Sequence, residues 1–407
     1  MVTGNFKIAM DSIKHAKWRS FFTMLGIIIG VASVVTIISI GEGVKKQVSE
    51  EIDRRGPDLI TVRPGKVAET DENGRINSAS IFSSLVNAPL SENDLKVVSG
   101  TSDVDYAVPV SYLSGVPKVE KTEMPRAVVF GTSGDLPKAL NQKIEYGAFF
   151  DKGANKNVAV IGPRVAEELF KETVPVGASM QLRGQSFVVV GIFEEFNDIS
   201  LSPEADYNTA IFIPTEAAKK LNNNQLPIQQ ILLRPDELSQ RDEVAKNVES
   251  RLLNSHAGQH DFSVLTQDNN RSISNEILNI LTSLVTAVAA VSLIVGGIGI
   301  MNVMIVSVTE RTHEIGIRKA VGATNRQILA QFVIESAVIS FVGGIFGIIV
   351  SLVANFVLRV STNLVPVITL PIMGIALVVA LLVGVVFGVA PALKAAQKDP
   401  IEALRRV

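Results

Sequence analysis

The sequence predicts a multi-pass α-helical membrane protein: four transmembrane helices, with a large mixed α/β domain inserted between helices 1 and 2. Hydrophobic residues make up 47% of the 407 residues and charged residues only 19%, below the roughly 25% of soluble globular domains. The apolar residues are concentrated in long uncharged runs, each able to cross a hydrocarbon core of about 30 Å as a helix. Lys and Arg lie beside these runs in a pattern that favours one orientation.

The N-terminal segment, residues 1–20, is predicted to be an amphipathic helix on the cytoplasmic membrane surface. Its lysines lie off the apolar face, and Trp18 lies at the expected headgroup level. The apolar face consists of Phe6, Ala9, Met10, Ile13 and Ala16. A frayed tail is the alternative.

Residues 21–42 form the first predicted transmembrane helix. Its apolar run, FFTMLGIIIGVASVVTIISI, contains no charged residue. A signal peptide has an apolar stretch of about 7–15 residues and then a small-x-small cleavage site, and this run fits neither feature. We therefore expect a retained anchor that continues into a polar helix.

Residues 43–276 are expected to form an outer domain of α and β structure. Short runs rich in β-branched residues predict the strands DLITVRP, VDYAVPV, RAVVFGT, NVAVIG, FVVVGIF, TAIFIP and QQILLRP. Amphipathic patterns predict the helices RVAEELF, TEAAKKL and RDEVAKNVESRLL. We expect loops at 68–79 and 194–208. The size of the domain favours two lobes, a membrane-proximal one (about 43–111 and 214–276) and an inserted one (about 112–213).

Three further transmembrane helices are predicted in the last third of the chain. They cover residues 277–308, 328–358 and 371–393, and the first of them begins with an outer stalk. A cytoplasmic coupling loop (309–327) and an outer loop (359–370) connect them, and a cytoplasmic tail (394–407) follows the last. Lys and Arg are frequent in the first 20 residues, the coupling loop and the tail, whereas the outer loop carries only Arg359. The positive-inside rule then places both termini in the cytoplasm and the large domain outside the cell membrane.

No catalytic, cofactor-binding or metal-binding residue is predicted. The sequence has no cysteine, no G-x-x-x-x-G-K-[ST] and no H-E-x-x-H motif, and no basic excess that would favour nucleic acid. His256 and His260 are four residues apart, but the intervening Gly258 indicates a loop rather than a helical metal site. We therefore expect a protein that is not an enzyme by itself.

The coupling loop carries the most informative pattern. Charged and apolar residues alternate, and glycines offer hinge positions, which suits a short helix that docks in a groove of another protein. The residues in question are Glu310, Arg311, Glu314, Ile315, Gly316, Ile317, Arg318, Lys319, Gly322 and Ala323. We expect Glu314 and Arg318 to be polar anchors, Ile315 and Ile317 to enter the groove, and Gly322 to form the turn. A solvated loop that only orients the protein is the alternative.

Two further features lie within the apolar runs. Three G-x-x-x-G pairs predict close helix packing, at Gly26 and Gly30, Gly343 and Gly347, and Gly384 and Gly388. Glu335 lies inside the third span, where a carboxylate needs a partner or a wet surface. Snorkelling to the inner interface is the alternative.

Three segments resemble the permease module of the MacB/FtsX family of ABC transporters. The first runs from Ile8 to Ala32 and contains KWRSFFTMLGIIIGVA; the second, from Thr309 to Ser336, reads E-R-x-x-E-I-G-I-R-K-A-V-G-A and then Q-x-x-x-Q-F-x-I-E-S. The third is the C-terminal motif, with Pro391, Asp399, Pro400, Leu404 and Arg405. The outer domain resembles the family's extracytoplasmic domain in position and size.

The resemblance implies a permease homodimer in the lipid bilayer that binds two copies of a separate ATPase subunit. Because no ATPase segment precedes the interfacial helix, we expect Mg-ATP to be used by that partner, with no cofactor on this chain. The family is described as working by mechanotransmission, in which the outer domains move and drive a partner. Efflux of antimicrobial peptides, antibiotics or other compounds with a membrane fusion (adaptor) protein is the function we expect.

One alternative, lipoprotein extraction, lies within the family, and two come from other functional classes. The chain could extract lipoproteins, as LolC and LolE do, or regulate a cell-wall hydrolase, as FtsX does; the shorter outer loops of FtsX-type proteins disfavour the latter. A plain membrane-anchored receptor domain is the third, and the structured coupling loop disfavours it. Neighbouring genes for an ATPase with an adaptor, or with a hydrolase, would distinguish them.

Overall fold

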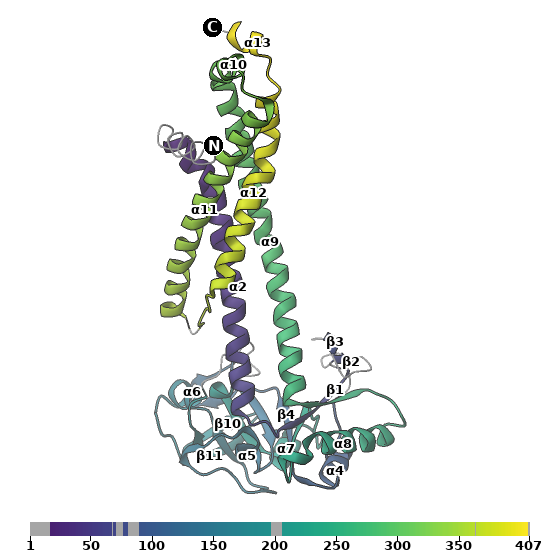
Figure 1. The fold of residues 1–407 in the computed structure, drawn as a ribbon. Coiled ribbons are helices and arrows are strands. Elements are labelled where there is room, and N and C mark those ends of the chain that lie inside the picture. Colours follow the sequence, from purple (N-terminus) through teal and green to yellow (C-terminus); the bar gives the residue numbers. More distant parts are fainter. Residues whose placement is uncertain are drawn as a thin grey trace. The chain divides into compact units, whose positions relative to one another are not determined.

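The computed structural model describes residues 17–66, 68–70, 76–79, 89–196, 206–362 and 364–405. The chain divides into two compact units (Figure 1). The outer unit is Lys46–Ile277, and the helical unit consists of the segments before and after it. The predicted interfacial helix lies almost entirely outside the described residues.

Four helices of the described chain are long and apolar enough to cross a membrane. They are α2 (Lys17–Arg54), α9 (Gln267–Glu310), α11 (Asn325–Ser361) and α12 (Leu370–Ala396). The predicted fold class, with a mixed α/β domain between the first two of these helices, is confirmed. α2 and α9 are both longer than the predicted spans, because polar helical turns extend each apolar run.

Small residues set the spacing of these helices. A Cβ atom added to Gly26 of α2 would lie 2.7 Å from the Cα atom of Gly296 in α9, so the two backbones touch. Gly343 and Gly347 of α11 face Ile27 and Val31 of α2. An added Cβ at Gly384 or Gly388 of α12 would overlap Ser340 or Ser336 of α11. Each predicted G-x-x-x-G pair therefore lies where two helices approach closely.

The described part of the outer unit contains one twelve-stranded mixed sheet and one hairpin. The path through the large sheet is β14-β1-β13-β4-β7-β12-β9-β11-β10-β5-β6, and β8 pairs with β11. The strands are β1 (Ile60–Pro64), β4 (Val104–Leu113), β5 (Lys118–Val119), β6 (Thr122–Glu123), β7 (Val128–Thr132), β8 (Ile144–Gly147), β9 (Val158–Ile161), β10 (Ser179–Leu182), β11 (Gln185–Phe193), β12 (Ala210–Pro214), β13 (Gln230–Pro235) and β14 (Phe262–Thr266). Because β4 pairs with both β13 and β7, one sheet runs through both predicted lobes, and the lobe boundaries stay a prediction.

Helices and short turns cover the sheet. They are α4 (Glu92–Ser99), α5 (Leu136–Leu140), α6 (Pro163–Val165), η1 (Ala166–Phe170), η3 (Tyr207–Thr209), α7 (Thr215–Leu221), η4 (Leu238–Gln240) and α8 (Arg241–Ser255). Two hydrophobic clusters form the core. One contains Val244, Val248 and Leu252 of α8. The other is rich in aromatic residues and contains Phe130, Phe193 and Phe212.

The prediction of a loop at 68–79 is wrong. β2 (Ala68–Thr70) and β3 (Ile76–Ala79) pair antiparallel there. Strands of three and four residues hold too few side chains for an alternating pattern to be visible in the sequence. Of the predicted loop at 194–208, the structure describes only 194–196 and 206–208, and η3 begins at Tyr207.

Candidate functional site

The coupling segment, which we define as residues 309–327, folds as a short helix between two turns. α9 ends at Glu310, α10 covers Thr312–Ala320, and α11 begins at Asn325. Gly322 has a φ of +107°, a conformation that side chains disfavour, and therefore forms the turn, as predicted. The Thr324 side chain then caps α11 in a reciprocal capping box with Gln327.

Arg311 connects this segment to the membrane helix α11. Its Nη1 atom lies 3.4 Å from both carboxylate oxygens of Glu335, and its Nε atom lies 3.3 Å from Glu314. The guanidinium also lies over the ring of Phe332, 5.9 Å from its centre. Glu335 is buried and has the partner that a carboxylate at this depth needs.

Arg318 and Lys319 fix the other end of α10. Arg318 donates to Oε1 of Gln331 at 2.6 Å. The Lys319 ammonium donates to the backbone oxygens of Ala396 and Lys398 at 2.7 Å each. These carbonyls lie at the C-terminus of α12, where a cation is favoured and the last oxygens lack helical partners.

The C-terminal motif forms the neighbouring surface. Pro391 lies inside α12, and α13 (Pro400–Arg405) packs beside α10. Asp399 accepts a hydrogen bond from the backbone N–H of Ile401 at 2.8 Å, which caps α13. Leu404 and Arg405 lie in α13, but their side chains are outside the described set.

The apolar residues of the coupling segment divide into two groups. Ile315 is only 2% exposed and belongs to the same buried cluster as Ile328 and Phe332, so the prediction that it enters a partner's groove is wrong. Ile317 is 45% exposed and Val321 85% exposed. The predicted docking residues did not include Val321 or Ile401, which is 74% exposed on α13. Gly316 is buried, Ala323 packs partly against the cluster, and Glu310 is exposed.

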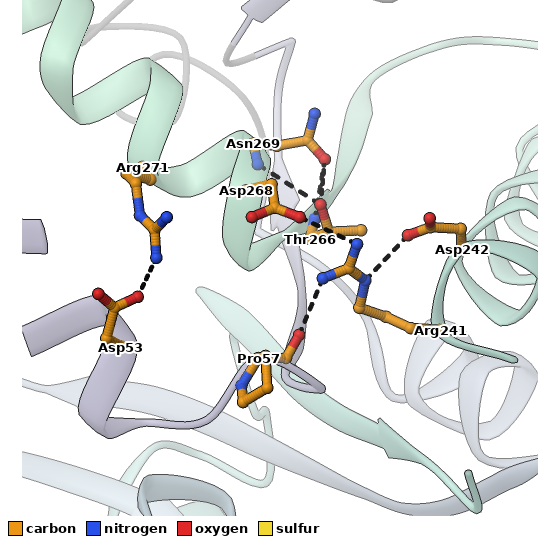
Figure 2. Close-up of polar contacts among 8 residues, drawn as sticks. All are labelled: Asp53, Pro57, Arg241, Asp242, Thr266, Asp268, Asn269 and Arg271. Atoms are coloured by element: carbon orange, nitrogen blue, oxygen red, sulfur yellow. Dashed lines mark hydrogen bonds and ion pairs between the residues drawn. The ribbon is translucent and has the colours of Figure 1, made fainter. Parts of the chain in front are cut away.

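In the outer unit, a group of polar contacts joins the end of α2 to the start of α9 (Figure 2). Arg241 of α8 donates to Asp268 at 3.0 Å, to Asp242 at 2.9 Å and to the backbone oxygen of Pro57 at 3.1 Å. Hydrogen bonding to Asp242 is the main cause that raises the pKa of Arg241 above its ordinary value. Arg271 of α9 pairs with Asp53 of α2.

We call this group, Asp53, Pro57, Arg241, Asp268 and Arg271, the helix clamp. Thr266 and Asn269 cap the start of α9 beside it, with Thr266 donating its backbone N–H to Asn269 at 3.1 Å. Sequence reasoning missed the clamp, because its members are separated by long stretches of chain and carry no motif.

The histidines form no metal site within the described residues. His256 contacts Asp94 and Asp261 instead, and the His260 ring stacks on Phe262.

Two family models match the chain. The model of the MacB-like periplasmic core domain matches residues 20–251, and that of the FtsX-like permease C-terminal region matches residues 286–400. The macrolide export ATP-binding/permease protein MacB of Marinobacter nauticus is 33% identical, over 98% of this chain and 60% of that protein. The uncharacterized ABC transporter permease YknZ of Bacillus subtilis is 30% identical, over 98% of both chains.

This chain therefore spans about 60% of the length of the MacB relatives. Two solved structures resemble part of this chain. The periplasmic region of MacB from Actinobacillus actinomycetemcomitans has a TM-score of 0.44 at 17% identity, covering 56% of this chain and 97% of that one. The extracellular domain of the ABC-type transporter YknZ has a TM-score of 0.39 at 15% identity, covering 51% of this chain and 100% of that one.

Proposed function

The chain belongs to the MacB-like family of ABC transporter permeases, and we propose that it converts ATP hydrolysis by a partner into motion of its outer unit. The coupling segment carries this proposal. Arg311, Arg318 and Lys319 fix it to the helical unit. Ile317 and Val321 remain exposed on α10, with Ile401 on the adjacent α13. An apolar surface on a firmly held short helix suits docking in a partner's groove.

The partner in this proposal is a separate ATPase subunit, present in two copies, which binds Mg-ATP. The 407 residues contain no phosphate-binding G-x-x-x-x-G-K-[ST] loop, so ATP binding by that route falls to the partner. This chain then acts as the permease and not as an enzyme by itself.

A second copy of the chain completes the proposed permease. The exposed apolar residues of α9 include a set with alternating spacings of four and three, as in coiled-coil seams: Leu284, Val288, Val291, Val295 and Ile298. This pattern supports a homodimer with α9 at or near the seam.

The coupling segment and both termini face the cytoplasm in this proposal, and the outer unit lies outside the cell membrane. The distribution of Lys and Arg supports that orientation. Labelling of Asn222→Cys but not Asn325→Cys by an impermeant thiol reagent on intact cells is expected, because the chain has no native cysteine; the reverse pattern would overturn the orientation.

We propose that the exported substrates are antimicrobial peptides, antibiotics or similar compounds. Their export in this proposal also requires an adaptor protein. The relatives named for macrolide export support this choice. The described residues offer no feature that favours lipoprotein extraction or control of a cell-wall hydrolase over export.

Replacement of Ile317 and Val321 by Asp tests the docking surface. Each change removes an apolar contact worth about 1.5–3 kcal/mol when buried. We therefore expect ATPase binding to weaken tenfold or more, measured with both purified subunits in nanodiscs. Leu238→Asp, at an exposed apolar site in the outer unit, is the control, and this variant should bind the ATPase normally.

This pair of changes is a cleaner test than reversal of Glu314 and Arg318, because those side chains already contact Arg311 and Gln331 within the chain. Unchanged ATPase binding by the Ile317→Asp/Val321→Asp protein would refute docking at α10. The coupling segment would then act only as a topology signal.

A further inference from the structure

His256 lies between two carboxylates at the C-terminus of α8. Its Nδ1 atom is 2.6 Å from Oδ1 of Asp261, and its Nε2 atom is 3.0 Å from Oδ1 of Asp94. The Asp94 side chain is only 6% exposed and that of His256 18%. Each ring nitrogen therefore faces a carboxylate oxygen at hydrogen-bond distance, and the imidazole and the Asp94 carboxylate are largely shielded from solvent.

This geometry requires an extra proton. A neutral imidazole has one N–H donor and one lone pair, so one of its nitrogens would face a carboxylate lone pair without a hydrogen between them. An imidazolium donates from both nitrogens and satisfies both contacts. The extra proton could instead be carried by the Asp261 carboxyl group, which would then donate to Nδ1. The site binds the same number of protons in both arrangements.

Asp94 has little freedom to turn away from the ring. Its Oδ2 atom accepts hydrogen bonds from the backbone N–H of Ser91 at 2.8 Å and from the Ser91 hydroxyl at 2.9 Å. The first of these bonds, together with the bond from the Asp94 backbone N–H to the Ser91 hydroxyl oxygen at 3.3 Å, forms the capping box of α4, and the two bonds to Oδ2 hold the carboxylate in place. The other oxygen is thereby left directed at His256.

The second carboxylate belongs to the turn that leads into β14. The backbone oxygen of Asp261 accepts from the N–H of Gly65 at 2.6 Å, and the next residue, Phe262, packs edge-on against the His256 ring. β14 ends at Thr266 and α9 begins at Gln267. His256 thus joins α4 and α8 to the strand that continues directly into a membrane helix.

We propose that His256, Asp94 and Asp261 form a proton-binding site, and that release of its proton loosens the corner between α4, α8 and β14. When the proton leaves, one ring nitrogen presents a lone pair to a carboxylate, and the contact on that side becomes repulsive. The contacts of His256 with the two carboxylates hold the turn from His256 to Asp261 and the start of β14 in place.

The surrounding charges favour the protonated form. Burial lowers the pKa of His256, but hydrogen bonds to Asp94 and Asp261 outweigh it, so the pKa lies above its ordinary value of 6.5. The helix C-terminus adds a further preference for a cation. Of the cations on the adjoining segments, Arg251 of α8 donates to the backbone oxygen of Gly100, and Lys66 follows Gly65, whose N–H binds the backbone oxygen of Asp261.

The sign of the pH dependence follows from the raised pKa. The stabilisation is fully present below pH 6.5, where the histidine is protonated in both the folded and the unfolded chain. It is lost as the pH rises through the folded-state pKa. The corner should therefore be closed in acid and looser in mild alkali.

Hydrogen–deuterium exchange of the full chain in nanodiscs at pH 6 and pH 8.5, corrected for intrinsic rates, tests the site without any ATPase or substrate. We expect backbone protection across residues 255–266 to fall several-fold at the higher pH in the unchanged protein. In His256→Asn this difference should disappear, whereas in His260→Gln, four residues away, it should persist. Protection that is independent of pH in the unchanged protein would overturn the proposal.

Asp261→Asn gives a second readout if His256→Asn fails to fold. It removes one carboxylate at a half-exposed site and keeps the histidine, so the midpoint of the protection change should move to lower pH. An unmoved midpoint would assign the titration to another group and overturn the proposal. Since neither measurement involves ATP hydrolysis, failure here leaves the proposed permease function untouched.

Discussion

Glu335 illustrates how much the position of a single residue in the sequence can reveal. Its place inside an apolar run predicts that it needs a partner, since an isolated carboxylate in a membrane is costly. The identity of the partner was not predictable, because Arg311 lies on the other side of the α10 turn, and only the fold brings the two together. The prediction that Ile315 enters a partner's groove was wrong for a related reason. The alternation of charged and apolar residues does not indicate which apolar side chains face the chain's own core.

We expect Arg311→Met to destabilise the helical unit, because it leaves Glu335 buried without this cation. Loss of one partner of a buried pair typically costs about 3–5 kcal/mol, whereas replacement of both by apolar residues is often neutral. The apparent melting temperature in detergent should therefore fall by several degrees in Arg311→Met and recover in Arg311→Met/Glu335→Met. Arg326→Met, which removes the same charge at an exposed site, is the control. A double variant no more stable than the single one would contradict the pairing.

At the scale of elements, hydrophobic runs predicted the membrane helices and the longer strands well. Strands such as β7 and β12 are rich in β-branched and aromatic residues and lie in the middle of the sheet, so their sequence and their burial agree. α4 and β14 were missed. The apolar residues of α4, Leu95, Val97 and Val98, all fall within four positions, and β14 is one short mixed run, FSVLT, so neither shows a repeated apolar pattern. η1 was predicted as part of an ordinary helix, and its wider π-turn has no signature in composition.

The α11–α12 pair offers a test at the same scale. Gly384→Leu should force the two helices apart, because even a Cβ atom at Gly384 overlaps Ser340, and overpacking costs about 1–3 kcal/mol. Gly374→Leu, in the same helix but with open space around it, should leave the melting temperature unchanged. Gly384→Ala should be only partly rescued by Ser340→Gly, because an added Cβ atom also lies 2.8 Å from the backbone oxygen of Ser336. Equal effects of the two leucine substitutions would show that helix lipophilicity, not close packing, determines stability.

At the scale of the whole molecule, the long apolar runs predicted the order of membrane helices and outer domain, whereas the helix clamp came only from the structure. α2 and α9 are the two connections of the outer unit to the helical unit, since the boundaries of the units fall within these helices. Within the outer unit, Arg241 and Arg271 join the last turn of α2 and the following residues to the first turns of α9. A displacement of either helix would therefore act on the other, and on α8, through these side chains.

We expect Arg241→Met/Arg271→Met to uncouple ATP hydrolysis from motion of the outer unit. Charge-assisted hydrogen bonds are worth about 1.5–3 kcal/mol each when buried, and less here, because the carboxylates of Asp53 and Asp268 are exposed. The domain should therefore stay folded while its helices move more independently. The measurement is the distance between nitroxide labels on Lys156→Cys in the two copies of the proposed homodimer, reconstituted with its proposed ATPase partner, before and after addition of ATP. Because the chain has no native cysteine, the labels report this position alone.

With the clamp intact, ATP should shift the distance between the labels. In the clamp variant, this shift should shrink while ATPase activity persists. Lys246→Met, an exposed change on the same helix, should behave like the unchanged protein. A full ATP-driven shift in the clamp variant would mean that other contacts carry the force from the helices into the sheet.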